Sequence, residues 1–153
     1  MRLYLVQHGE AESPERDPDR ALTTRGREDI ERLAALCVRR NLRVARIVHS
    51  GKTRALQTAA CLAHAMLDEG EMETSGLLEP QADPAPFARV LNAWTTDTLV
   101  VGHQPFLARL AARLLGDGAR PRLNFSPGSM ACLEQGDDGD WTLAGFLRPE
   151  LLD

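Results

Sequence analysis

Short apolar runs alternate with longer amphipathic segments along most of the chain. The runs at Leu3–Val6 and Thr98–Val101 predict strands that are buried on both faces, and RIVH at Arg46–His49 predicts a third short strand. Apolar residues recur at helical spacing from residue 24 to about residue 40 and again from 52 to 67, which predicts two amphipathic helices. Strands therefore alternate with helices in the first half of the chain.

The segments between these elements are richer in turn-forming residues. Residues 8–23 and 68–86 predict loops, the second with a short strand near Met72–Ser75. Apolar residues at helical spacing over 87–94 predict a short third helix. Pro105 predicts the first turn of a fourth helix, because proline suits the first helical position.

The last part of the chain changes character. Ser129–Leu133 and Trp141–Phe146 predict two strands, and the GDDGD sequence between them is typical of a hairpin. Together these elements predict an α/β fold with three layers, α/β/α, in which a mostly parallel sheet ends in a C-terminal antiparallel hairpin. No repeat or linker divides the chain, so we predict that residues 1–153 form a single domain.

Composition narrows the class of protein. With 153 residues, 43% of them hydrophobic and 26% charged, the chain resembles an ordinary globular protein. A formal net charge of -4 argues against a nucleic acid partner. The three cysteines lie among apolar residues and form no CxxC pair, which favours buried thiols in a reducing compartment over disulfides or a cysteine zinc site.

The apolar segments are short. The N-terminal apolar run is too short for a signal peptide, and no segment has the length of a membrane span. We therefore expect a cytoplasmic protein with no membrane partner. We also expect a monomer, because no long exposed apolar stripe is left once the helices are placed.

Chemically versatile residues follow three of the predicted strands. His8, His49 and His103 each stand where a strand ends. Because ligands of open α/β sheets bind outside the carboxyl ends of the strands, we expect a crevice there. Arg54 lies in the first turn of the next helix, where its guanidinium can turn back toward the crevice beside N–H groups that favour anions. Such a site suits a phosphate, with a histidine as nucleophile and Gly9 allowing close approach.

Four sequence blocks resemble the motifs of the histidine phosphatase (phosphoglycerate mutase-like) superfamily, in this order along the chain: VQHGEAE, DRALTTRG, SGKTRALQTA and VGHQP. They span residues 1 to about 107, and their order makes the match specific. Little is inserted between the second helix and the fourth strand, whereas larger members carry long insertions there. In this respect the chain looks most like the small SixA-type phosphohistidine phosphatases.

The resemblance implies roles for the matching residues. His8 matches the nucleophile, which takes the phosphoryl group and forms a phosphohistidine that water hydrolyses. Arg54 matches the arginine that holds the equatorial oxygens, His103 the histidine that hydrogen-bonds them, and Arg20 a basic residue at the pocket rim. Phosphoryl transfer of this kind works by positioning and charge stabilisation. The resemblance therefore implies neither a metal nor a cofactor.

One position departs from the family pattern. Gln7 stands where most members have arginine before the nucleophilic histidine. Glutamine, like the backbone at Gly9, can still bind a phosphate oxygen but adds no positive charge. Losing a charge-assisted contact costs about 1–3 kcal/mol of binding, or about ten- to hundredfold. Arg20 and Lys52 are candidates to supply the missing charge.

Three functions remain open at this point. The first is a phosphohistidine phosphatase acting on a partner protein, such as a phosphotransfer domain. The second is hydrolysis of small phosphate esters, for which Glu79, or Asp83 in the same loop, is the candidate acid that protonates the alkoxide. A phosphohistidine needs such an acid less, because imidazole leaves more readily. The third is a phosphate-binding module with little turnover because of Gln7, although a pure binder would not need His8.

Overall fold

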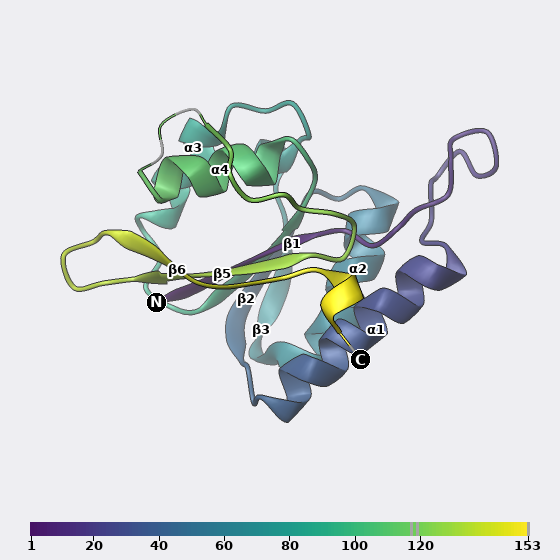
Figure 1. The fold of residues 1–153 in the computed structure, drawn as a ribbon, viewed down its shortest axis with the longest axis horizontal. Coiled ribbons are helices and arrows are strands. Elements are labelled where there is room, and N and C mark those ends of the chain that lie inside the picture. Colours follow the sequence, from purple (N-terminus) through teal and green to yellow (C-terminus); the bar gives the residue numbers. More distant parts are fainter. Residues whose placement is uncertain (117, 119, 153) are drawn as a thin grey trace.

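One six-stranded sheet runs through the molecule, with α1 and α2 packed on one face and α3 and α4 on the other (Figure 1). The computed structural model describes residues 1–116, 118 and 120–152. Along the chain the elements are β1 (Arg2–Gln7), α1 (Thr24–Arg39), β2 (Val44–His49), α2 (Thr53–Met66), β3 (Leu67–Thr74), η1 (Gly76–Leu78), α3 (Pro84–Leu91), β4 (Thr98–Gly102), α4 (Phe106–Leu114), β5 (Met130–Gln135), β6 (Trp141–Leu147) and η2 (Pro149–Leu151).

The order of the strands confirms the predicted fold. Across the sheet they lie in the order β3-β2-β4-β1-β5-β6. The first four are parallel, whereas β5 runs antiparallel to β1 and forms a hairpin with β6. The register places Gln7 opposite Gly102 and His49 opposite Val101. The residues that follow β1, β2 and β4 therefore meet at one edge of the sheet.

Two apolar clusters fix the three layers. Ile30 of α1 and Leu62 of α2 are fully buried against one face, and Phe87 of α3 and Leu110 of α4 against the other. Strand β1 contributes to both clusters because successive side chains of a strand point to opposite faces. Its continuous apolar run is thus explained by burial on both sides. Within the described residues, no helix combines the length and the apolar character needed to cross a membrane.

One predicted loop was wrong. The segment after α2 forms strand β3 over Leu67–Thr74, where we predicted a loop with a short strand only near Met72–Ser75. β3 is an edge strand with the sequence LDEGEMET, and all but its first residue are exposed. The sequence of β3 has neither an apolar run nor alternating apolar and polar residues, so it does not predict a strand. Its four acidic side chains blunt the open edge against pairing with another chain.

Helix α3 is displaced from its predicted position. It spans Pro84–Leu91 and so begins and ends three residues before the predicted range of 87–94. The Asp83 side chain accepts a hydrogen bond of 3.0 Å from the Ala85 amide, and Pro84 takes the first helical position. The capping residues therefore determine where the helix begins, whereas the spacing of apolar residues alone predicted a start and an end three residues too late.

Candidate active site

His8 is the first residue after β1, and only 9% of it is exposed. Its Nδ1 lies 2.7 Å from the carbonyl oxygen of Gly9. Because a carbonyl can only accept, Nδ1 carries the proton and Nε2 keeps its lone pair. The pKa of His8 is lowered to about 4, mainly by burial and in addition by the charges of Arg54 and Arg20, while the hydrogen bond to Gly9 acts in the opposite direction. The imidazole is therefore neutral at pH 7, as a nitrogen nucleophile requires.

His103 follows β4 and lies beside His8, with 5.0 Å between the ring centroids. It is 2% exposed. Burial, followed by the charge of His8 and those of the neighbouring cations, lowers the pKa of His103 to about 3. Its Nε2 lies 2.6 Å from the Ser50 hydroxyl oxygen, and its buried Nδ1 has no hydrogen-bond partner within the described part of the chain. This ring is also neutral at pH 7.

Ser50 contacts one ring nitrogen of His103 through its hydroxyl group. The hydroxyl oxygen accepts a long hydrogen bond of 3.4 Å from the Lys52 amide, and the hydroxyl can donate its own hydrogen to Nε2 of His103. In that arrangement the proton of the neutral ring lies on Nδ1, and His103 can donate a hydrogen bond to a ligand, whereas His8 keeps a free lone pair.

Two arginines bring positive charge to the histidines. Arg54 is the second residue of α2, and its Nε is buried without a hydrogen-bond partner among the described residues. Burial lowers its pKa, Arg20 lowers it further, and Glu79 raises it. Arg20 donates its Nε–H to the Glu12 carbonyl at 3.0 Å, rather than pairing with a carboxylate of its own loop. Its charge also acts on His8, so both predicted arginines lie near the nucleophile.

The candidate acid lies at the rim of this pocket. Glu79 Oε2 is 3.2 Å from Lys52 Nζ, and the side chains are 52% and 34% exposed. Glu79 also acts on Arg54, and Lys52 contributes to the lowered pKa of His103. The structure thus brings together the proposed acid and one of the two residues considered as a source of the missing charge.

Gln7 and Gly9 flank His8 in the chain. The Gln7 amide is bound to the Ser129 carbonyl at 3.1 Å, while its buried side-chain oxygen has no partner within the described residues. The Gly9 amide donates to the Thr58 hydroxyl at 3.0 Å. A Cβ at Gly9 would lie 2.9 Å from the Gly26 carbonyl oxygen, so glycine is required here by the packing of α1. Contact of Gly9 with a phosphate stays a prediction.

Two further residues of the site, Ser50 and Thr58, were not singled out by the sequence analysis. Thr58 links Gly9 to α2, since its hydroxyl donates to the Arg54 carbonyl at 2.8 Å. The role of Ser50 had a usable signal: it follows β2, and β2 is the parallel neighbour of the strand that leads to His103. Strand order, which the sequence does not state, was needed to use it.

Chemically, the site offers an unprotonated imidazole nitrogen on His8, a second neutral imidazole on His103 and three cationic side chains: Arg20, Lys52 and Arg54. This is an arrangement for a phosphoryl group, whose oxygens take charge-assisted hydrogen bonds while the phosphorus meets the nucleophile. In the part of the chain that the structure describes, no group of three or more histidine, cysteine, aspartate or glutamate side chains is placed to hold a metal ion.

Comparison with known proteins identifies the family. The model of the histidine phosphatase superfamily (branch 1) matches residues 3–79, and the chain belongs to this family. An uncharacterized protein of Picosynechococcus sp. is 30% identical over 143 residues, which cover 89% of this chain and 86% of the relative.

Solved structures of similar fold include several phosphatases. The protein histidine phosphatase SixA, complexed with tungstate, aligns over 100% of both chains with a TM-score of 0.88 and 24% identity. A candidate SixA phosphohistidine phosphatase from Agrobacterium tumefaciens covers 97% of both chains, with a TM-score of 0.79 and 27% identity. The α-ribazole phosphatase from Shigella flexneri also covers 97% of both chains, with a TM-score of 0.75 and 18% identity. The shared fold therefore hosts more than one substrate class.

Proposed function

We propose that the chain is a phosphatase that hydrolyses the phosphoryl group of a phosphohistidine on a partner protein. The observation that carries this proposal is the neutral His8, whose Nε2 lone pair is free while Nδ1 is held by the Gly9 carbonyl. Arg54 and His103 lie beside it. Similarity to SixA phosphohistidine phosphatases supports the substrate class.

The reaction proceeds in two displacements. Nε2 of His8 attacks phosphorus, the P–N bond of the substrate breaks, and its electron pair returns to the departing imidazole, which is protonated by solvent. Arg54 and the Nδ1–H of His103 hold the equatorial oxygens as negative charge shifts onto them. Water then attacks the phosphorus of the phosphohistidine formed at His8. The P–Nε2 bond breaks, which releases inorganic phosphate and restores the neutral ring.

The ion pair at the rim favours an N-phosphoryl substrate over an ester. Ester cleavage needs an acid that protonates an alkoxide, but the Glu79 carboxylate is paired with the Lys52 ammonium 3.2 Å away. An imidazole leaves without that help. We therefore expect Glu79→Gln to leave phosphohistidine hydrolysis little changed, whereas an ester phosphatase would lose most of its turnover.

The test follows phosphate release from a phosphotransfer domain that has been phosphorylated on histidine with phosphoramidate. Wild type is expected to turn over, and His8→Ala to be inactive. His64→Ala, which alters an exposed histidine of α2, is the matched control and should retain activity. Gln7→Arg restores the charge usual in the family and should raise kcat/KM by about ten- to hundredfold, the value of a charge-assisted contact.

The alternatives predict different results. A silent wild type that Gln7→Arg activates would identify a phosphate-binding module or an enzyme for another substrate. Binding of the phosphorylated domain without turnover in either form would overturn the phosphatase proposal. Steady hydrolysis of alkyl phosphate esters that is lost in Glu79→Gln would favour the ester phosphatase.

A further inference from the structure

A cavity of about 650 Å³ lies on the sheet face that carries α1, and its lining includes none of the residues assigned above to the candidate active site. Small-molecule sites commonly enclose roughly 300–1,000 Å³. The cavity is bordered by the amino-terminal half of β1, by β5 and β6, by the end of α1 and by the C-terminal turn η2. Among the described residues, α1 and α2 cover the parallel strands, whereas only the end of α1 and the turn η2 border this face of the C-terminal hairpin.

The floor of the cavity is apolar and has room for a ligand. Leu36 of α1, Met130 and Cys132 of β5 and Leu147 of β6 line it. Gly145 lies opposite Cys132 in the hairpin, and a Cβ built on this glycine would meet no atom within 4 Å. The space next to Gly145 is therefore open, and a larger side chain at this position would occupy it.

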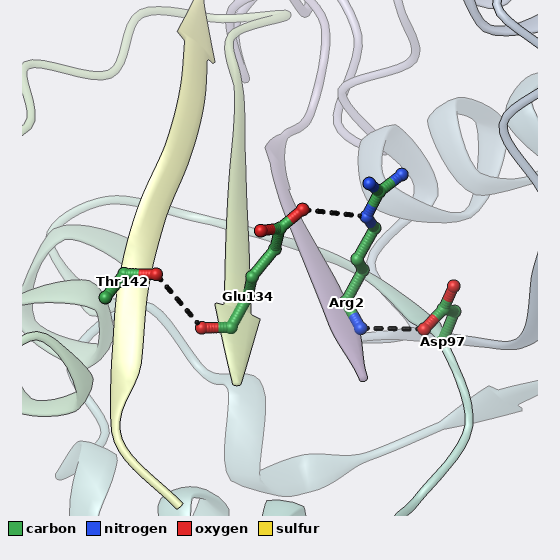
Figure 2. Close-up of polar contacts among 4 residues, drawn as sticks. All are labelled: Arg2, Asp97, Glu134 and Thr142. Carbon is green, nitrogen blue, oxygen red and sulfur yellow. Dashed lines mark hydrogen bonds and ion pairs between the residues drawn. The ribbon is translucent and has the colours of Figure 1, made fainter. Parts of the chain in front are cut away.

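The rim of the cavity is positively charged. Arg2, Arg39 and Arg40 line it, and Glu134 is the only acidic residue among the described lining residues. Glu134 is already paired, since its Oε1 lies 3.0 Å from Arg2 Nε. Figure 2 shows this pair, with the two terminal nitrogens of Arg2 directed away from the carboxylate. Within residues 1–116, 118 and 120–152, the side chains of Arg39 and Arg40 form no ion pair or hydrogen bond.

We propose that this cavity binds an organic monoanion with an apolar body, of the class of medium-chain or aryl carboxylates. The carboxylate would be held by Arg39 and Arg40, whose guanidinium groups offer paired N–H donors that match its two oxygens. The apolar body would cover Cys132 and Leu147 and occupy the open space at Gly145. The site is independent of the proposed phosphatase reaction, because no residue is shared between the two.

Decanoate, kept below its micelle concentration, is the probe. We expect its addition to the full ¹⁵N-labelled chain to produce saturable shifts in the amide signals of Leu36, Cys132 and Gly145, with those of His8 unchanged. Decanol, which has the same chain without the charge, should bind more weakly. Phosphatidylglycerol vesicles provide the comparison with an anionic lipid surface.

Two variants and a control locate the site. Arg39→Gln combined with Arg40→Gln should weaken decanoate binding by about tenfold or more, because two charge-assisted contacts are lost. Gly145→Leu should abolish binding by filling the open space. The matched control combines Arg109→Gln with Arg113→Gln, which alters two exposed arginines of α4 on the opposite layer and should leave affinity unchanged.

Three results would overturn the proposal. These are shifts that do not saturate, an affinity unchanged in the Arg39/Arg40 variant, and binding to phosphatidylglycerol vesicles without binding to monomeric decanoate. If Gly145→Leu unfolds the chain, the arginine variant decides, because Arg39 and Arg40 are both exposed.

Discussion

Two neighbouring histidines have opposite hydrogen-bonding roles at the proposed site. Each ring has one nitrogen tied to the protein, through the Gly9 carbonyl for His8 and the Ser50 hydroxyl for His103. Burial keeps both rings neutral. A carbonyl oxygen can only accept, so it fixes a proton on Nδ1 of His8, whereas a hydroxyl that donates to Nε2 of His103 leaves the ring proton on Nδ1. The same residue type thus supplies a nucleophile at one position and a donor at the other.

Ser50 is therefore expected to position His103. In Ser50→Ala the ring loses the hydroxyl that selects the Nδ1–H tautomer, and kcat for phosphate release should fall by about tenfold, with a smaller change in KM. Ser50→Thr keeps the hydroxyl and should retain most activity. Ring ¹⁵N shifts of His103 report the tautomer directly. Identical shifts in wild type and Ser50→Ala would contradict this role.

The lowered pKa values predict acid sensitivity. An unfolded chain binds a proton on each histidine below about pH 6.5, whereas the native chain does so only near pH 4 at His8 and near pH 3 at His103. The resulting stability is fully present above pH 6.5 and is lost as the pH falls toward 4. Urea unfolding should show that the free energy of unfolding falls by on the order of a few kcal/mol between pH 7 and pH 4.5. In His103→Gln the free energy of unfolding should depend less on pH, whereas in His64→Gln the pH dependence should match that of wild type. The same pH dependence in all three proteins would contradict the role given to His103.

At the scale of elements, burial decides what a sequence reveals. β1 and β4 are recognisable because their apolar runs are needed on both faces of the sheet. β3 is not, because an exposed edge strand is specified by backbone pairing with β2 and carries acidic side chains. In the candidate site, too, some features have a sequence signature and others do not. The motifs placed the two histidines and Arg54 together, but the ion pair between Lys52 and Glu79 joins two elements through side chains and has no signature in either segment.

The first turn of α1 packs directly on the segment that follows His8. Replacing a helical glycine with alanine ordinarily stabilises a helix by roughly 0.5–1 kcal/mol. At Gly26 a Cβ would lie 2.1 Å from the Glu10 carbonyl oxygen, so Gly26→Ala should instead destabilise the protein by about 1–3 kcal/mol. Gly76→Ala is the control, because its Cβ meets no atom within 4 Å. Denaturant unfolding measures both, and a stabilised Gly26→Ala would refute the close contact.

At the scale of the molecule, the histidine site and the proposed carboxylate cavity lie toward opposite ends of β1. His8 follows its carboxyl end, and Arg2 stands at its amino end, where the Arg2 amide donates to Asp97 at 2.7 Å (Figure 2). Six strand residues span about 20 Å, beyond the distance at which substitutions usually couple. The combined Arg39→Gln and Arg40→Gln variant should therefore release phosphate from the phosphorylated domain at the wild-type rate. A changed kcat would show that the cavity and the histidine pocket are linked.

The distribution of exposed apolar side chains bears on assembly. Among the described residues, the large ones lie on different elements: Val38, Leu56, Met72, Leu77, Val90, Leu143 and Leu151. Stable interfaces need contiguous apolar patches, and the outer edge of β3 carries acidic side chains that oppose strand pairing. We therefore expect a monomer of 16.8 kDa in sedimentation equilibrium across a wide concentration range.

The same reasoning predicts how the monomer could be made to associate. Glu69→Thr combined with Glu71→Thr removes two charges from the β3 edge and adds residues that favour strands, so this variant should self-associate with rising concentration. Glu28→Thr combined with Glu31→Thr, on the exposed surface of α1, makes the same change in charge away from any sheet edge and should stay monomeric. A wild-type dimer, or equal association of both variants, would show that the β3 charges do not control assembly.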